Sequence, residues 1–418
     1  MKEIMEENME SLTMERFEEA TDIVSQVTNE TKLLYSPYFS QMTENKVYLK
    51  PENMQTTGSY KIRGSYYKIS TLPEEQREKG LIAASAGNHA QGVAYAAMHY
   101  GCKATIVMPQ NTPLLKVNRT KEYGAEVILY GKDYDEACDH ALKLAEEHGY
   151  TFIHPFDDAA VITGQGTIAM EIIKELPTVE YVLVPIGGGG LAAGVSKLLK
   201  LFNPNIHIIG VEPANAACMK ASIEAGELVT LPSANTIADG TAVRTPGSLN
   251  YEIVRDNVDE IITIADEELI VAFLDLMENH KIVAENSGLL TIAALRHLDI
   301  KNKKVVSVIS GGNMDVITMS SIVQHGLVER GRIFTVSVLL PDTPGQLVSV
   351  ASTIAEAQGN VVKLEHNQFV SVNRMAAVEL RVTIEAFGKE HRDEIIHKLA
   401  EAGFRPRLVS SKGQISLN

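Results

Sequence analysis

The sequence predicts an α/β region followed by a small α+β domain. Through the first 330 residues, short apolar segments typical of buried strands alternate with helical segments, which indicates open twisted parallel sheets covered by helices on both faces. From residue 331 the expected order is strand, helix, strand, strand, helix and strand, the ferredoxin-like arrangement. We therefore expect an α/β region at 1–330, with a smaller lobe at roughly 50–155 inserted in it, and an α+β domain at 331–418.

Hydrophobic periodicity places the elements of the first region in order. Residues 12–26 carry apolar side chains at helical spacing, and residues 47–50 form a short strand that leads to a helix at 64–70. Residues 236–241 are expected to be an irregular loop. The remaining strands are expected at 80–84, 104–109, 126–130, 181–186, 207–212 and 304–309, and the remaining helices at 93–100, 113–123, 134–148, 191–202, 214–225, 266–280 and 287–297.

The pattern changes in the last part of the chain. After the first strand, a Pro- and Gly-containing turn at 341–347 opens a helix that continues to residue 357. A second helix is expected at 389–402. The four strands are expected at 332–340, 360–366, 376–385 and 405–410.

Composition narrows the class of protein. The chain has 45% apolar and 22% charged residues, which is ordinary for a globular protein. Its net charge of −15 argues against nucleic acid or an anionic membrane surface as a partner, and solubility is the preferred explanation of that charge. The three cysteines form no Cys-x-x-Cys pair, so we expect no disulfide framework, no structural zinc and a cytoplasmic location. We expect neither a secretion signal nor a membrane span.

Lys61 is a candidate nucleophile. It lies between Gly58 and Gly64 among small and apolar residues, whereas a lysine ammonium is strongly hydrated and usually lies on the surface. In a half-buried turn, its charged form is disfavoured, its pKa falls, and its amine becomes available for Schiff-base chemistry. A surface lysine at a helix start is the alternative interpretation of this segment taken alone.

Three turns present small residues at the carboxyl ends of strands, where open α/β sheets bind ligands. The turn at 85–92 can bind a carboxylate or phosphate through backbone N–H groups, although close packing alone would also explain it. His89 in this turn is either a catalytic base or, as we prefer, a packed or capping histidine. The four glycines at 187–190 are the strongest phosphate signal, because they cost backbone entropy unless the backbone closely approaches a ligand. The third turn is 310–313.

Four motifs in this order resemble the fold-type II pyridoxal phosphate enzymes, and within them threonine ammonia-lyase (threonine dehydratase). They are Ser-Tyr-Lys-Ile-Arg-Gly at 59–64, Ser-Ala-Gly-Asn-His at 85–89, the glycines at 187–190 and Ser-Gly-Gly-Asn at 310–313. Asp-Thr-Pro-Gly-Gln-Leu at 342–347 resembles an ACT domain. The resemblance covers nearly the whole chain and implies pyridoxal 5′-phosphate as cofactor between two lobes.

The resemblance also implies a role for each motif. Lys61 would bond covalently to the cofactor aldehyde and later move the substrate Cα proton, and Asn88 would hydrogen-bond the phenolic oxygen of the cofactor ring. Ser310 would lie against the pyridine nitrogen. The phosphate would be held by the backbone of Gly187, Gly188, Gly189, Gly190 and Leu191, and the substrate carboxylate by the turn formed by Ser85, Ala86, Gly87, Asn88 and His89.

A serine at the ring nitrogen favours one reaction class. A neutral hydroxyl cannot keep the nitrogen protonated as a carboxylate would, so the ring is a weaker electron sink. Electron density at Cα then expels a leaving group at Cβ, which favours elimination over transamination. For threonine or serine the leaving group is hydroxide, for which the cofactor phosphate is a candidate acid, and the products are a 2-oxo acid and ammonia.

Two departures from relatives carry expectations of their own. Serine racemases, which the chain also resembles, have a serine where Ala86 stands, so we expect dehydration without efficient racemisation. Some relatives bind a divalent cation through a glutamate, a carbonyl and an aspartate. Glu212 and the Ala216 carbonyl match, but Cys218 replaces the aspartate, so no metal is expected beyond a weak, monovalent site.

The ACT-like tail implies regulation by an amino acid bound near Asp342, Gly345 and Leu347, with isoleucine as the first choice and valine as an antagonist. A dimerisation module without a ligand is the alternative. The leading function is therefore an allosteric L-threonine ammonia-lyase of isoleucine biosynthesis, a homo-oligomer (tetramer or dimer). A serine or hydroxyaspartate dehydratase and a catalytically silent amino-acid sensor are the alternatives.

Overall fold

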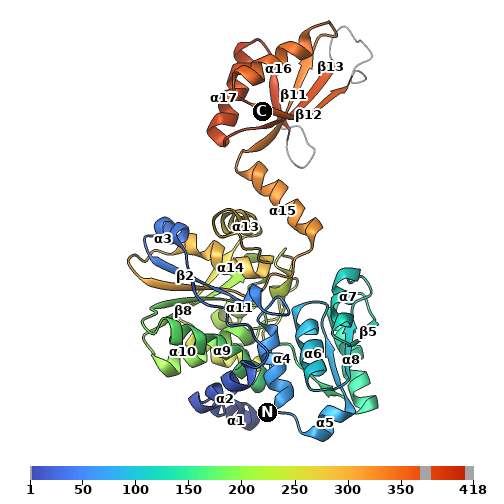
Figure 1. Ribbon diagram of the computed structural model, residues 1–418, viewed down its shortest axis with the longest axis vertical. Coiled ribbons are helices and arrows are strands. Elements are labelled where there is room, and N and C mark those ends of the chain that lie inside the picture. Colours follow the sequence, from blue (N-terminus) through green and yellow to red (C-terminus); the bar gives the residue numbers. More distant parts are fainter. Residues whose placement is uncertain (1, 368–377, 410–418) are drawn as a thin grey trace. The chain divides into compact units, whose positions relative to one another are not determined.

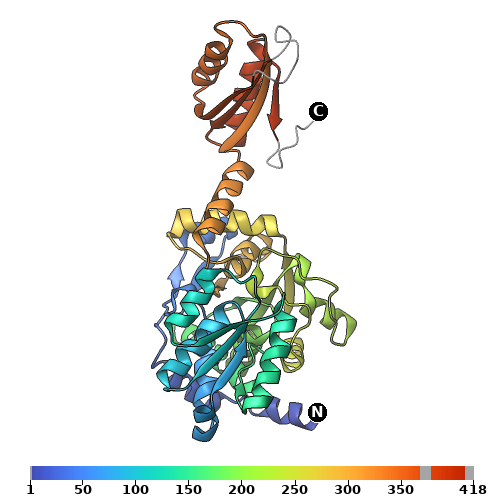
Figure 2. The same cartoon turned by 90° about the vertical axis from the view of Figure 1, so that its right-hand side faces the viewer.

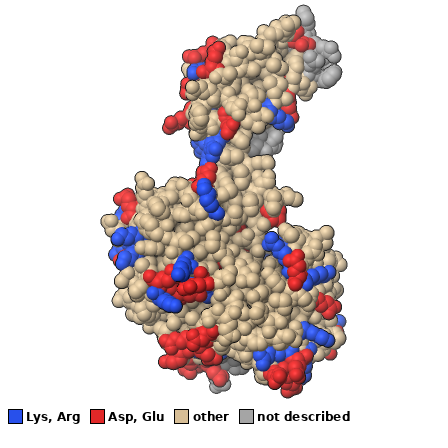
Figure 3. Space-filling view, viewed as in Figure 1, with Lys and Arg blue, Asp and Glu red and all other residues tan. Residues whose placement is uncertain are grey.

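The computed structural model describes residues 2–367 and 378–409, and the chain divides into two compact units, Met1–Asp315 and Val316–Asn418. Figures 1 and 2 show the elements of both units. On the face shown in Figure 3, acidic side chains gather over the N-terminal helices α1 (Lys2–Glu10) and α2 (Met14–Val24), while Lys and Arg are scattered over the first unit. Within the described residues, no helix has the length and apolar character needed to cross a bilayer.

The larger lobe of the first unit is built on a six-stranded sheet. Its order is β1-β2-β10-β7-β8-β9, and every pair is parallel except β1–β2. The nearly all-parallel pairing confirms the predicted α/β class. The strands are β1 (Leu34–Tyr35), β2 (Lys46–Pro51), β7 (Tyr181–Pro185), β8 (His207–Pro213), β9 (Glu260–Ile264) and β10 (Lys304–Ile309).

Helices cover both faces of this sheet (Figure 1). The helix α14 (Asn286–Ala294) packs on β7 to β10, while α9 (Ala159–Glu175) and α10 (Gly190–Phe202) pack together on the other side. The remaining helical segments of this lobe are α3 (Pro37–Thr43), η1 (Glu52–Met54), η2 (Ala214–Ala216), α11 (Cys218–Ala225), η3 (Asp239–Thr241), α12 (Ser248–Asn257), α13 (Asp266–His280) and η4 (Leu295–His297).

The smaller lobe has a four-stranded parallel sheet in the order β5-β4-β3-β6. Side chains of the central strand alternate: Leu81 and Ala83 join the core under α6, whereas Ile82 and Ala84 join the core under α8. The elements of this lobe are α4 (Lys61–Ser70), α5 (Glu74–Lys79), β3 (Leu81–Ala84), α6 (Asn88–His99), β4 (Ala104–Met108), α7 (Leu114–Glu122), β5 (Glu126–Leu129), α8 (Tyr134–His148) and β6 (Thr151–Phe152).

One prediction near Lys61 was wrong by three residues. The helix α4 begins at Lys61 rather than at Gly64, so the lysine lies in the first turn of a helix and not in a preceding turn. Gly64 is not a boundary residue, because a Cβ there would lie 2.4 Å from the Gln165 side chain and 2.8 Å from the Val161 carbonyl oxygen. Glycine is present so that α4 can approach α9 closely. Gly58, with φ +73°, forms the turn before the helix.

The second unit has the predicted ferredoxin-like topology. Its antiparallel sheet has the order β12-β13-β11-β14. The helix α15 (Val316–Glu329), in a segment for which the sequence predicted no element, belongs to this unit, where it packs on β11. The other elements are β11 (Ile333–Leu340), α16 (Gln346–Glu356), β12 (Asn360–Asn367), β13 (Val378–Glu385), α17 (Lys389–Glu401) and β14 (Pro406–Val409). Residues 376 and 377 of the strand predicted at 376–385, and residue 410 of the strand predicted at 405–410, lie outside the described residues.

Candidate active site

The two lobes of the first unit enclose a cavity of about 770 Å³. Its walls come from the start of α4, the β3–α6 turn, the β7–α10 loop and the end of β10. The cavity is therefore lined by all four predicted motifs, although they are far apart in sequence. The predicted residues that line it are Lys61, Ser85, Ala86, Gly87, Asn88, His89, Gly187, Gly188, Gly189, Gly190, Leu191 and Ser310.

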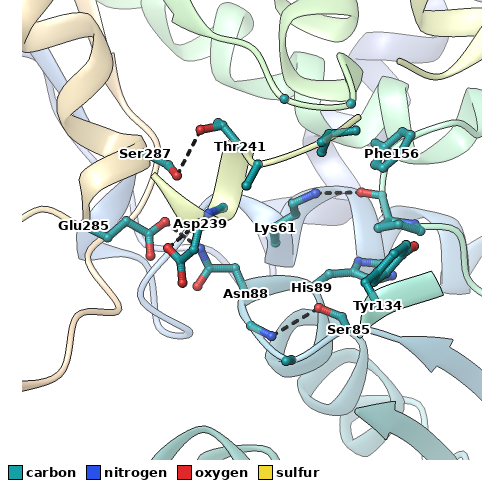
Figure 4. A pocket seen from close by; sticks show the side chains of 18 of the residues that line it. Lys61, Ser85, Asn88, His89, Tyr134, Phe156, Asp239, Thr241, Glu285 and Ser287 are labelled. Carbon is teal, nitrogen blue, oxygen red and sulfur yellow. Dashed lines mark hydrogen bonds between the residues drawn. The ribbon is translucent and has the colours of Figure 1, made fainter. Parts of the chain in front are cut away.

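Lys61 reaches into this cavity (Figure 4). Its Nζ donates a hydrogen bond of 2.7 Å to the carbonyl oxygen of Pro155. Burial lowers the pKa of Lys61 to about 8, and the charge of Glu285 opposes that shift. Near neutral pH, an appreciable fraction of this amine is therefore unprotonated, which is what nucleophilic attack on an aldehyde requires.

The β7–α10 loop forms a cradle that only glycine fits. A Cβ on Gly188 would lie 2.5 Å from the Phe156 ring, and one on Gly190 would lie 2.7 Å from the Phe156 carbonyl oxygen. Gly189 has φ +98°, in the left-handed region that favours glycine. The backbone therefore lies against Phe156 with no side chain between them.

Hydrogen bonds fix the direction of this loop. The Gly188 carbonyl oxygen accepts bonds from the Asn250 side-chain amide at 2.8 Å and from the Gly247 N–H at 3.0 Å. The loop runs directly into α10, whose first-turn N–H groups have no intrahelical acceptors. These N–H groups and the helix dipole make the loop an anion site facing the cavity.

The β3–α6 turn offers a second anion site. The helix α6 starts at Asn88, and the Gly87 N–H donates to the Ser85 Oγ at 3.2 Å. A Cβ on Gly87 would meet nothing within 4 Å, so glycine leaves open space beside the backbone here. The first-turn N–H groups of α6 lie at the cavity wall, where a carboxylate can bind.

Both ring nitrogens of His89 have hydrogen-bond partners. Its Nε2 lies 2.9 Å from the carbonyl oxygen of Ile153 and its Nδ1 lies 3.4 Å from the Ser65 hydroxyl. Because a carbonyl only accepts, Nε2 carries the proton and Nδ1 accepts from Ser65. Burial, reinforced by the charge of Lys61, lowers the pKa of His89 to about 3. The preferred reading of His89 as a packed histidine fits these contacts.

A polar chain joins the two lobes beside Asn88. The Asn88 amide donates to the Glu285 Oε1 at 2.6 Å, and its Oδ1 accepts from the Asn313 amide at 2.8 Å. Asn313 in turn accepts from Arg119 on α7 at 3.1 Å. Asn88, predicted to contact the cofactor ring, is thereby held in one orientation.

Glu285 is the main cavity residue that the sequence analysis did not single out. It lies at the start of α14, is 7% exposed, and its pKa is raised to about 8 by burial and by the charge of Asp239. The carboxyl group is therefore largely neutral at pH 7. A lone glutamate among small and apolar residues at a helix start was the available signal, but carboxylates are common at helix N-termini, so the pattern alone was not specific.

Ser310 and Glu212 occupy different surroundings. Ser310 follows β10, is 3% exposed and lines the cavity.

Glu212 lies at the end of β8, where its carboxylate accepts from the N–H groups of Met219 at 2.9 Å and Lys220 at 2.8 Å. The Cys218 Sγ lies 3.9 Å from the Gly187 carbonyl oxygen. Glu212 therefore caps α11, and the contact of Cys218 with Gly187 places the start of that helix beside the glycine loop.

A family profile described as "Pyridoxal-phosphate dependent enzyme" matches residues 24–311, which include all of the cavity-lining residues except Asn313, Met314 and Asp315. The chain belongs to this family. It is therefore an enzyme with pyridoxal 5′-phosphate as cofactor, and the predicted fold-type II architecture is confirmed.

Relatives of this pyridoxal-phosphate family refine the comparison. The chain is 44% identical to an L-threonine ammonia-lyase of Thermotoga maritima over 95% of this chain and 100% of that one. The processed form of threonine deaminase isoform 2 from Solanum lycopersicum superposes with a TM-score of 0.71 at 39% identity, covering 74% of this chain and 93% of the other. Maize serine racemase also has a TM-score of 0.71, at 34% identity, with 76% and 98% covered.

The cavity fits pyridoxal phosphate in size and in chemistry. It combines an amine of lowered pKa, a glycine cradle that leaves backbone N–H groups for a phosphate, and a buried serine. Its volume of about 770 Å³ leaves room for an amino acid beside the cofactor. Lys61, the loop at 187–191, Asn88 and Ser310 are the residues that would hold the cofactor.

Proposed function

We propose that this enzyme is an L-threonine ammonia-lyase, which converts L-threonine to 2-oxobutanoate and ammonia by β-elimination. The observation that carries the proposal is the Lys61 amine, which lies between two anion sites in one cavity and has a pKa of about 8. One anion site suits the cofactor phosphate and the other the substrate carboxylate. Relatives named L-threonine ammonia-lyase, which this chain matches over nearly its whole length, supply the substrate.

Each group has a task in this reaction. The turn at 85–89 holds the substrate carboxylate through backbone N–H groups, and Lys61 takes the Cα proton. Bound pyridoxal phosphate supplies the electron sink that makes this proton acidic. Ser310 keeps the ring environment neutral, which favours loss of hydroxide from Cβ. Residues of both lobes line the cavity and bring these groups together in one site.

Separate assays with threonine and serine test the substrate. We expect 2-oxo acid and ammonia in equal amounts from both, with a higher kcat/KM for L-threonine. D-serine formation from L-serine should be far slower than deamination, because Ala86 at the cavity wall has no proton to give. Chromatography of the 2-oxo acid and of the serine enantiomers measures both. If the enzyme deaminates serine or hydroxyaspartate but not threonine, that amino acid is the substrate instead. D-serine formed at a rate comparable to deamination would identify the enzyme as a racemase.

A catalytically silent amino-acid sensor is the second candidate. The similarity of the second unit to an ACT domain favours it, but a sensor has no need of Lys61, Asn88 and Ser310 together. Protein that deaminates neither threonine, serine nor hydroxyaspartate when supplied with pyridoxal phosphate would favour the sensor.

We further propose that the second unit regulates the first in isoleucine biosynthesis. In the second unit, Gly345 has φ +92° and directly precedes α16, and a Cβ there would meet nothing within 4 Å. Backbone N–H groups at this turn, beside Asp342 and the partly exposed Leu347, suit an amino-acid carboxylate. The catalytic region at 1–330 and the regulatory domain at 331–418 would then act together in a homo-oligomer, a dimer or tetramer.

All three cysteines are free, which supports a reducing, cytoplasmic location.

Titration with branched-chain amino acids tests this regulation. We expect isoleucine to lower activity at subsaturating threonine and valine to oppose it, because effectors act by binding two states unequally. Initial rates measured against each amino acid give the result. Gly345→Val should abolish the response and leave activity without effector intact. No change in rate up to millimolar isoleucine or valine would leave the second unit as a dimerisation module.

A further inference from the structure

Four charged side chains, three of them buried and one partly buried, surround the start of α4, and none of them lines the cavity. Lys50 and Glu52 are fully buried, Arg63 is 1% exposed, and the Glu171 side chain is 19% exposed. They come from β2, η1, α4 and α9. Charged side chains are rarely buried unless they are paired, so we expect these four side chains to depend on one another for their positions. We refer to Lys50, Glu52, Arg63 and Glu171 as the buried quartet.

Arg63 is the centre of the quartet, and all five of its N–H groups are bonded. Nε and one NH2 proton donate to the two Glu52 oxygens at 2.7 and 2.8 Å. NH1 and the other NH2 proton donate to the two Glu171 oxygens at 2.7 and 3.0 Å. The last NH1 proton donates to the Thr167 hydroxyl at 3.1 Å. Only a planar guanidinium can hold two carboxylates in this double fork.

The remaining contacts of the quartet close it into one network. Lys50 donates to Glu171 and to the Thr31 carbonyl oxygen, and the Thr31 hydroxyl donates to Glu52 at 2.6 Å. Burial alone would raise the pKa of Glu52, but the charge and hydrogen bonds of Arg63, the charge of Lys50 and the Thr31 hydrogen bond together hold that pKa below its ordinary value. Two basic and two acidic side chains therefore face one another in a single network. Loss of one member would leave an unbalanced buried charge.

The quartet ties the helix that carries Lys61 to the larger lobe as well. The apolar face of α4, which includes Ile62, Tyr66 and Ile69, is part of the smaller lobe's core. On its other side α4 is fixed by Arg63 to η1 and α9, elements of the larger lobe that also holds the glycine loop and Ser310. Arg63 is two residues from Lys61 within the same first turn. A shift of the guanidinium would therefore move the lysine relative to the phosphate site.

We propose that Arg63 is a positioning residue for Lys61: its double fork to Glu52 and Glu171 fixes the start of α4 to the larger lobe, so that the Lys61 amine stays in register with the Gly187–Gly190 phosphate cradle. The proposal rests on the role of Lys61 given above. Reaction rates depend steeply on the relative position of reacting groups, since a misplacement of about 1 Å can lower the rate about 100-fold.

Arg63→Lys in the full-length holoenzyme tests the proposal. Lysine keeps the charge but cannot form either fork. We expect kcat to fall by about tenfold or more while KM for threonine changes by less than about threefold, because the carboxylate-binding turn is untouched. We also expect faster loss of the visible cofactor absorbance during dialysis. Neither change follows from a lower melting temperature alone.

Arg296→Lys is the matched control. Arg296 pairs with Asp275 in the same lobe, away from α4 and from the cavity. This control should keep both kcat and the cofactor dissociation rate. If Arg63→Lys does not fold, Glu171→Gln, which weakens one fork at the partly exposed member, should change the same two quantities in the same direction. Folded Arg63→Lys with control-like kcat and cofactor retention would overturn the inference. The dialysis readout needs no substrate, so inactivity of the parent enzyme on threonine would reject the proposed function and leave this test intact.

Discussion

Lys61→Ala is expected to lose the visible absorbance band of the bound cofactor and to lower threonine deamination by at least about 1000-fold. The residue removed is both the covalent attachment point and the group that moves the Cα proton, and one positioned proton-transfer group alone contributes about 100- to 10,000-fold. Added pyridoxal phosphate should not restore the rate. Absorbance spectra of the purified variant and a 2-oxo acid assay measure the two effects.

Lys68→Ala is the control for this experiment. Lys68 lies on the same helix α4, pairs with Asp158 at 2.6 Å and does not line the cavity. Its removal should leave the cofactor band and turnover close to those of the parent. If Lys61→Ala retained the absorbance band and deaminated threonine at the rate of the parent, another group would bind the cofactor covalently.

Gly189→Ala is expected to cause the second-largest loss, through the phosphate cradle. The left-handed backbone of Gly189 costs an alanine roughly 1–2 kcal/mol. In addition, the new Cβ would lie 2.7 Å from the Met219 Cε and 2.8 Å from the Asn250 Cβ, which adds about 1–3 kcal/mol of overpacking. If the loop moves to relieve this strain, its N–H groups leave the phosphate, so cofactor affinity should fall by tenfold or more, which is about 1.4 kcal/mol.

Gly226→Ala separates backbone strain from the cradle. Gly226 also has a left-handed backbone, with φ +75°, but a Cβ there would meet nothing within 4 Å. We expect this variant to lose stability, seen in denaturant unfolding, and to keep its cofactor affinity. Equal cofactor affinities in Gly189→Ala and the parent, measured by equilibrium dialysis, would contradict the role of the glycine loop.

The sequence predicted the parts of the fold that depend on short, local patterns. The helix Tyr134–His148 and the strand Lys304–Ile309 have the predicted bounds because clear periodicity and clear ends coincide there. The helix Ala159–Glu175 was missed. It is buried on nearly all sides and rich in Gly, Ala and Thr, so it shows no polar face from which a helical period can be read.

The cavity was predicted motif by motif, but its interactions were not. Lys61 and the four glycines could be found because each is unusual at a helix start or a strand end, whereas the role of Ser310 was implied by the resemblance to a known family. Two of the contacts that define the site join residues far apart in sequence: Arg63 and Glu171 are 108 positions apart, and Asn88 and Glu285 are 197 positions apart. Only the packing of α4 against α9, and of one lobe against the other, makes those contacts visible.

The most direct measurement of the central claim is the site of cofactor attachment. The holoenzyme would be reduced with borohydride, digested, and its peptides analysed by mass spectrometry. The account predicts that the peptide containing Lys61, and no other lysine, carries the mass of the reduced cofactor. The mass found on a different lysine, or on none in a protein that remains active, would contradict it.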